Sequence, residues 1–393
     1  MNRPTGPSRP RAVRAAAIAV AALGIGYAPI AATEIWPYAR PGAPALGERL
    51  LAHTVDSQYV ADAVADRTAP YGHSLTALIV HSVLGAALML LGPVQLLTAV
   101  RRRRRLHRAL GTVYAVAVYA AMAAAAAYLA RTAPEDAFGG ASFWIVLAVI
   151  LAGTVLSCTF GVLAALTRRP DIHQRWMLLC YGYLMTAPLL RLEWGTLPRF
   201  WPGLPMQDIN RLALMHLGTL VVLGALLASR AGDRRRTVAG LTGSWAPGPL
   251  LLAAHLAGAL GLTWLGISFR AAGPEGQRLL VALLVPHLSA VALLARRRAA
   301  AGRAGRGWAR EEWSIHLAAF GLAPAFSAGC TVLFEHALHL DRLTALTAGA
   351  GIGTGVLAFA ATAVVSLRLQ YARHVLALAP PPAATATPAT APA

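Results

Sequence analysis

Ten stretches of mostly apolar residues recur along the chain, and short polar segments separate them. A helix needs about 20 such residues to cross the hydrocarbon core of a bilayer. The stretches cover roughly residues 12–33, 73–100, 109–130, 142–167, 176–197, 211–229, 248–269, 278–295, 313–333 and 344–367. Charged residues form only 13% of the chain, whereas soluble domains usually carry roughly 25%. The sequence therefore predicts an all-α fold, a polytopic transmembrane helix bundle of about ten spans.

The distribution of arginine predicts the orientation of this bundle. The 35 basic residues are all arginine, and 25 of them lie in the two termini and in alternate loops, together with only four of the 16 acidic residues. Cytoplasmic loops carry such an excess of positive charge. We therefore expect both termini in the cytoplasm of a multi-pass protein of the cell membrane. No basic domain with interleaved aromatic residues lies outside the spans, so nucleic acid is not an expected partner.

The spans and linkers divide the chain into four parts. Residues 1–72 form an uncleaved N-terminal anchor helix and an outer loop, and residues 73–230 form a five-span block. Residues 231–370 form a four-span block, and residues 371–393 form a tail rich in Pro, Ala and Thr that we expect to be disordered. In the outer loop, apolar residues at helical spacing predict one amphipathic helix; they are Leu51, Val55, Tyr59, Ala63 and Val64.

Ionisable side chains inside hydrocarbon are costly and therefore mark candidate sites. His81 and His216 lie at similar depths inside the outer ends of their spans, and Arg191 lies near the outer end of another. Two histidines on facing helices are the ligands that a six-coordinate haem b requires. One hypothesis is therefore that His81 and His216 bind haem and that Arg191 pairs with a propionate. A histidine hydrogen-bonded to a neighbouring helix is the simpler alternative for each.

A second polar group lies at the cytoplasmic edge and comprises Gln95, His107, Arg108, His173 and Arg175. Residues of these types at helix ends also reach lipid headgroups and water, so an anchoring role is the alternative interpretation. The three cysteines lack the spacing of metal ligands, and no Ser-His-Asp, HExxH or CxxC pattern occurs. We therefore predict no metal site, and no motif indicates an enzyme.

The order of motifs over residues 73–195 resembles domain-of-unknown-function family 2306, a bacterial family of predicted multi-pass membrane proteins. The resemblance implies a membrane protein without an established activity, and it directs attention to the group at the cytoplasmic edge. Besides His81 and Arg191, the positions that match the family pattern are Gln95, His107, Arg108, Gly111, Tyr114, His173, Arg175, Trp176 and Met177. Gln174 departs from the pattern, in which a basic residue is more usual, and the chain has four additional C-terminal spans.

Three classes of function remain open at this stage. The first is a haem-binding electron carrier that uses His81, His216 and Arg191. The second is a transporter or binding protein for a small molecule, although few acidic residues lie in mid-membrane to couple ions. The third is a membrane assembly factor that performs no chemistry. The lipid bilayer is the one partner that all three require.

Overall fold

The structure is a computed structural model that describes residues 11–40, 42–43, 45–232 and 245–378. In these ranges the regular secondary structure consists of helices, without a strand. Nine helical segments among the described residues are long and apolar enough to cross a membrane. Helices satisfy their own backbone hydrogen bonds, which is what a span in lipid requires. The predicted all-α, multi-pass transmembrane fold is confirmed.

The helices follow one another with short connections. The first part of the chain contains α1 (Arg11–Thr33), α2 (Trp36–Ala39), α3 (Leu46–Thr54), α4 (Ser57–Gly72), α5 (Leu75–Leu96), α6 (Thr98–Arg102), α7 (Arg104–Arg131) and α8 (Gly140–Leu166). The remainder contains α9 (Pro170–Leu184), α10 (Thr186–Thr196), α11 (Met206–Gly232), α12 (Gly248–Ala271), α13 (Gly273–Arg303), α14 (Gly307–Ala337) and α15 (Arg342–Leu378). Two short 3₁₀ turns, Pro134–Asp136 and Leu197–Arg199, lie in the connections.

The span predicted at 176–197 is divided into two helices, α9 and α10, which meet at Met185. Pro188 explains the break, because a proline cannot donate to the carbonyl of Leu184 and its ring clashes with that carbonyl. Pro188 lies in the first turn of α10, where a proline is tolerated. Since α11 packs along both helices, α9 and α10 together cover the length of one continuous span.

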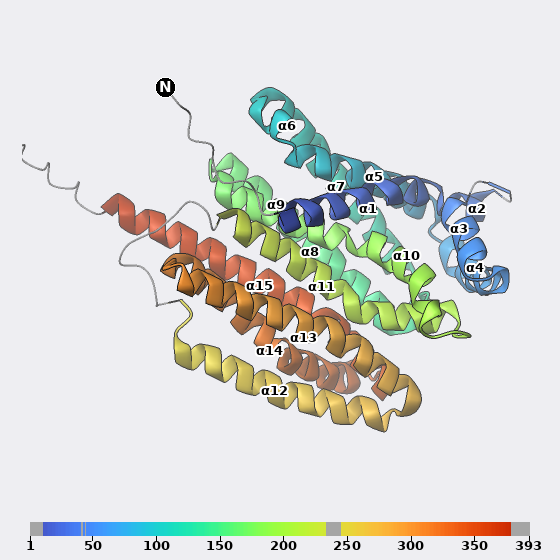
Figure 1. Cartoon of the computed structure of the whole chain (residues 1–393). Helices are drawn as coiled ribbons and strands as arrows, with labels where there is room; N and C mark the ends of the chain where they lie inside the picture. Colours follow the sequence, from blue (N-terminus) through green and yellow to red (C-terminus); the bar gives the residue numbers. More distant parts are fainter. Residues whose placement is uncertain (1–10, 41, 44, 233–244, 379–393) are drawn as a thin grey trace, which may run out of the picture.

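The outer loop forms a cap over one end of the bundle, and we use this name for α3 and α4 (Figure 1). The prediction of one amphipathic helix through Val55 was wrong, because the chain breaks there and α4 starts anew. The Asp56 side chain causes the new start by accepting hydrogen bonds from the backbone N–H groups of Gln58 and Tyr59. The Tyr59 hydroxyl donates to the backbone carbonyl of Trp194 at 3.1 Å, which fixes the cap to α10.

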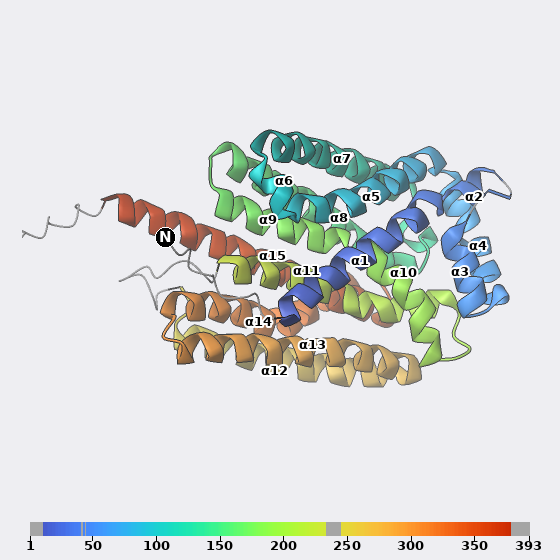
Figure 2. The same ribbon diagram turned by 45° about the horizontal axis from the view of Figure 1, so that its top comes forward.

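The helices form two groups that meet at α11. Helices α1, α5, α7 and α8 lie together, and α12, α13, α14 and α15 form the second group (Figures 1 and 2). Helix α11 is the most deeply buried span, and it packs against α9, α10, α13 and α15. The start of α1 and the end of α15 both lie away from the cap, as an even number of crossings requires (Figure 2). Which side is cytoplasmic stays a prediction.

The C-terminal helix is longer than predicted. The tail was expected to begin at residue 371, but α15 continues to Leu378, and residues 379–393 lie outside the described part of the chain. The helix extends through this region because residues 371–378 still include strong helix formers such as Ala and Leu, and the prolines begin only at Pro380.

Buried ion pairs join α14 to α9 and to α15 at the end away from the cap. Arg175 of α9 pairs with Glu312 of α14, and Arg175 also donates to the Ser229 hydroxyl at 3.2 Å. Arg368 of α15 is fully buried and donates to Glu311 at 2.6 Å. The sequence placed Glu311 and Glu312 in a polar cytoplasmic segment, but both side chains are buried within α14. They are the counter-ions of arginines from other helices.

Replacement of Glu312 by alanine leaves the buried Arg175 guanidinium without its counter-ion. We expect Glu312→Ala to lower the free energy of unfolding by about 3–5 kcal/mol, the usual cost of breaking a buried pair. The double variant Arg175→Met/Glu312→Leu removes both charges and is expected to restore most of this loss. Chemical denaturation in detergent, followed by circular dichroism, measures both effects.

Glu335→Gln is the matched control. Glu335 pairs with Arg342, whose side chain is 45% exposed, so we expect a loss below about 1 kcal/mol. Equal losses for Glu312→Ala and Glu335→Gln would contradict the role given to Arg175 and Glu312.

Candidate functional site

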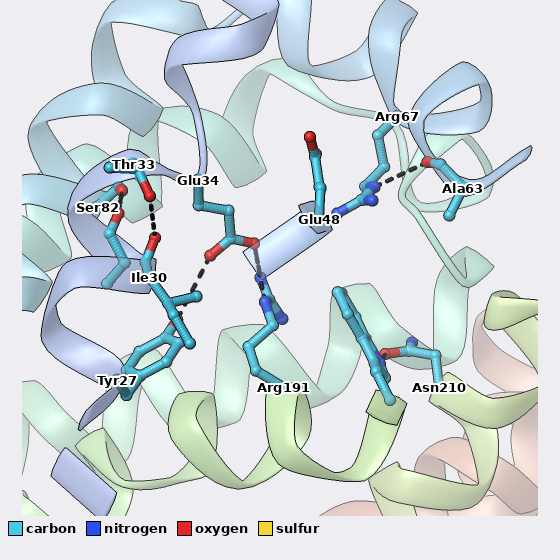
Figure 3. A network of polar contacts seen from close by, with 12 residues as sticks. Tyr27, Ile30, Thr33, Glu34, Glu48, Ala63, Arg67, Ser82, Arg191 and Asn210 are labelled. Carbon is cyan, nitrogen blue, oxygen red and sulfur yellow. Dashed lines mark hydrogen bonds and ion pairs between the residues drawn. The ribbon is translucent and has the colours of Figure 1, made fainter. Parts of the chain in front are cut away.

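An ion pair between Arg191 of α10 and Glu34, which follows α1, lies beneath the cap (Figure 3). The Arg191 Nε atom donates to Glu34 Oε1 at 2.8 Å, and the Tyr27 hydroxyl donates to Glu34 Oε2 at 3.4 Å. The guanidinium also lies over the Trp194 ring, 4.0 Å from its centroid. The pair is only partly exposed, 19% for Arg191 and 11% for Glu34. Such a position strengthens the attraction between the two charges.

Two cavities meet at this ion pair, because Tyr27, Glu34 and Arg191 line both of them. The first, which we call the inner cavity, has a volume of about 200 Å³ and lies among α1, α5, α7, α8, α9 and α10. The second, which we call the cap pocket, has a volume of about 240 Å³ and lies between α1, the cap and α10. Both are lined mainly by apolar side chains. The Arg191–Glu34 pair is therefore the polar wall between two apolar spaces.

Arg67 of α4 lines the cap pocket and is only 2% exposed. Its Nε atom donates to the Ala63 carbonyl at 2.8 Å, and its guanidinium lies over the rings of Phe138 and Trp194, at 5.2 Å and 5.5 Å. Glu48 of α3 lines the same pocket, and burial raises the pKa of its carboxyl group. Trp194 thus lies between two guanidinium groups, one from the cap and one from α10.

His81 lines the inner cavity, on the α5 side. Its Nδ1 atom lies 2.9 Å from the Ala121 carbonyl of α7. Since a carbonyl only accepts, Nδ1 carries the proton and Nε2 keeps its lone pair. Ser82, the next residue, donates to the backbone carbonyl of Ala31 in α1. The predicted site residues His81 and Arg191 therefore line one cavity.

His216 is engaged elsewhere and does not line either of the two cavities. Its Nε2 atom lies 3.0 Å from the Ala282 carbonyl of α13, and its Nδ1 atom lies 2.9 Å from Glu193 Oε1. An axial ligand needs a free nitrogen lone pair facing the iron, and neither nitrogen of His216 offers one. Arg191 is committed to Glu34. The contacts of His216 and Arg191 do not fit a haem held between His81 and His216.

Two histidines of the group that the sequence places at the cytoplasmic edge lie close together in the structure. The rings of His107 and His173 lie edge to face with centroids 6.5 Å apart, and His173 Nδ1 lies 2.8 Å from the Gly161 carbonyl. The Gln95 amide lies beside Gly111, where a Cβ atom would be 3.8 Å from its nitrogen. Both polar atoms of the Gln95 amide and His107 Nδ1 are buried without a hydrogen-bond partner among the described residues. Gln95 and His107 therefore each bury polar atoms that have no partner among the described residues, whereas His173 is hydrogen-bonded.

The other family motif residues have different surroundings. Arg108 is exposed, as an anchoring role at the headgroups predicts. The Tyr114 hydroxyl lies 4.0 Å from the Cys180 sulfur, and Trp176 packs against Phe160 and Phe359. Met177 occupies the space that the missing side chain of Gly161 leaves. Tyr114, Trp176 and Met177 therefore contribute to helix packing, whereas Arg175 forms the ion pair with Glu312. Within the described residues, no cluster of three or more His, Cys, Asp or Glu could hold a metal ion.

Sequence reasoning missed Glu34, Glu48 and Arg67 as site residues. Arg67 carried a usable signal, because it follows Tyr59 and Ala63 at intervals of four residues and so falls on the apolar face of its helix. A charged residue on such a face indicates a buried charge. For Glu34 the signal was weaker: it is the first acidic residue after the first apolar stretch, where headgroup contact is the ordinary interpretation.

The comparisons with known proteins bear on one segment of the chain. Residues 78–228 match the model of a family described as predicted membrane protein, DUF2306. The resemblance that the motifs indicated is confirmed. The matched segment runs from α5 into α11 and includes His81 and Arg191, but Glu34, Glu48 and Arg67 precede it. No curated protein and no solved structure matches the chain.

The unpartnered amide of Gln95 has a measurable consequence for stability. We expect Gln95→Met to leave the free energy of unfolding in detergent unchanged, or to raise it by up to about 1–3 kcal/mol, because an unpaired buried polar group is removed. Asn210→Leu is the control, since Asn210 accepts a hydrogen bond from the Trp194 indole at 3.1 Å. A loss for Gln95→Met as large as that for Asn210→Leu would show that the amide has a bound partner.

Proposed function

We propose that this protein of the cell membrane binds a small, mainly apolar molecule in the inner cavity. The observation that carries the proposal is the sharing of one ion pair, Arg191–Glu34, by two adjoining apolar cavities. Ligand sites in proteins are typically concave and mostly apolar, with a few polar groups that fix orientation. The inner cavity has this composition, with His81, Tyr27 and the ion pair among its polar groups.

The ion pair controls how the two spaces connect. Displacement of Glu34 from Arg191 would join the inner cavity to the cap pocket and give a ligand a route beneath the cap. On the side of α15, Tyr183 lines the inner cavity, its hydroxyl donates to the Gly355 carbonyl at 3.0 Å, and its ring packs within the core. This geometry favours a binding protein with access from one side over a transporter with a passage through the membrane.

The other two classes have less support. Electron transfer through a haem held by His81 and His216 conflicts with the hydrogen bonds of His216. A reduced-minus-oxidised absorbance spectrum with sharp haem bands, lost in His81→Ala, would revive that class. An assembly factor needs neither cavity, and it predicts that filling the inner cavity leaves the rescue of a deletion strain unaffected.

Gly85 offers a direct test of the inner cavity. It lines this cavity, and a Cβ atom at this position would meet nothing within 4 Å, so the first carbon of a larger side chain fits there. We expect Gly85→Leu to weaken binding of the probe 1-decanol by about tenfold, a loss of roughly 1.4 kcal/mol. Calorimetric titration of the protein in lipid nanodiscs, corrected with empty nanodiscs, measures the affinity.

Gly329→Leu is the matched control for partition of 1-decanol into the nanodisc lipid and for the effect of a glycine-to-leucine change on the stability of the protein. Gly329 is exposed on α14, outside both cavities, and its Cβ position is equally open. We expect this variant to bind 1-decanol as the unsubstituted protein does. The proposal fails if 1-decanol does not bind above the empty-nanodisc level, or if both variants bind it equally.

A further inference from the structure

Arg67 is a buried cation without a carboxylate counter-ion among the described residues. No ion pair to it is present there, although Glu34 and Glu48 line the same pocket. Glu34 is held by Arg191 and Tyr27, and the Glu48 carboxylate accepts from the Tyr38 hydroxyl at 3.5 Å. One of the terminal nitrogens of Arg67, Nη2, is buried without a hydrogen-bond partner. Each of the other buried arginines, Arg175 and Arg368, has a glutamate.

Burial of an unpaired charge is costly, and the contacts of Arg67 offset only part of that cost. The Ala63 carbonyl satisfies Nε, and the faces of Phe138 and Trp194 attract the cation. None of these contacts supplies a negative charge, and the Glu48 carboxyl group in the same pocket attracts Arg67 without forming an ion pair with it. A guanidinium matches the planar oxygens of a carboxylate or a phosphate, and such charge-assisted hydrogen bonds are about twice as strong as neutral ones. The pocket therefore lacks one component, an oxyanion beside Nη2.

The side chains that line the cap pocket indicate the chemistry of the remainder of the bound molecule. Ala22 and Gly26 on α1, which is one of the candidate membrane spans, line the pocket and are themselves exposed, and so is Leu192 on α10. Apolar wall residues exposed on spanning helices face lipid chains. A molecule that enters the pocket from the bilayer can keep an apolar chain against these residues while its head reaches Arg67.

We propose that the cap pocket binds the oxyanion head of an amphiphile, such as a fatty acid, with Arg67 as the group that pairs with the head. The inference rests on the proposed function, since it names the chemical class of molecule that the two adjoining cavities receive. Arg191 also lies over the Trp194 ring, but it keeps Glu34 as its own counter-ion. Arg67 therefore provides the selectivity for an anion, and the apolar walls provide the selectivity for a chain.

Two probes that differ only in the head group test the inference. Decanoate and 1-decanol are titrated into the full chain in neutral lipid nanodiscs, with the unsubstituted protein and with Arg67→Met. We expect Arg67→Met to weaken decanoate binding by about 10- to 100-fold, the range of one hydrogen bond to a charged group. Binding of 1-decanol is expected to change by less than about twofold, because its hydroxyl carries no charge.

The control for charge is Arg211→Met. Arg211 lies on α11 near the same end of the bundle and pairs with Glu275 and Asp208, outside both cavities. The variant Arg211→Met alters the net charge as Arg67→Met does, and we expect this variant to leave decanoate binding unchanged. A similar loss in both variants would overturn the inference, because the effect would then come from the overall field of the protein.

Inorganic phosphate separates a chain-bearing ligand from a free anion. We expect phosphate to compete with decanoate only weakly, since it has no chain to contact the apolar walls. Competition by phosphate at the same concentration as decanoate would overturn the assignment of an amphiphile. Gly26 lines the cap pocket, and a Cβ atom at this position would meet nothing within 4 Å, so Gly26→Leu is expected to weaken decanoate binding.

The stability of Arg67→Met without a probe is the remaining readout. Because the variant removes an unpaired buried charge, we expect its melting temperature to equal or exceed that of the unsubstituted protein. A large drop in melting temperature with unchanged decanoate affinity would show a structural role and overturn the inference. The two proposals fail differently: Gly85→Leu without effect on 1-decanol removes the inner-cavity function, whereas equal loss of decanoate and 1-decanol in Arg67→Met removes the anion site.

Discussion

Hydrocarbon does not solvate charge, and this constraint accounts for the arrangement of the polar residues in the bundle. Three arginines on transmembrane helices meet it with a glutamate from a distant part of the chain: Arg175 with Glu312, Arg368 with Glu311 and Arg191 with Glu34. Each pair joins helices that the sequence alone does not place together. Arg67 departs from this pattern, which is why the proposed ligand site is placed there and not at the more conspicuous histidines.

The segment that matches the family model does not contain the glutamates that pair with Arg175 and Arg191. Arg175 and Arg191 lie within residues 78–228, but Glu312 comes from the C-terminal helices and Glu34 comes from the connection after α1. The flanking helices are therefore integral to the bundle, because they neutralise charges that the family segment buries. This also explains why motif positions alone indicated Arg175 as an edge residue: its partner lies outside the motif.

The sequence predicted the fold well because hydrophobic length alone determines where a chain crosses a bilayer. It did not predict the break between α9 and α10, although Pro188 was a visible cause, nor the break in the cap that Asp56 creates. The site was predicted in part: His81 and Arg191 do line one cavity, but His216 faces Glu193 and Ala282. Helix adjacency determines such contacts, and no spacing within a single chain reveals which helices are neighbours.

The break at Met185 makes α10 a short rigid segment with three attachments. Arg191 holds Glu34, Glu193 holds His216 on α11, and the Trp194 carbonyl accepts from Tyr59 on the cap. Because these side chains share one helix of 11 residues, a tilt of that helix moves all three attachments together. A displacement of α10 that releases Glu34 from Arg191 would therefore also act on the contacts of α10 with the cap and with α11.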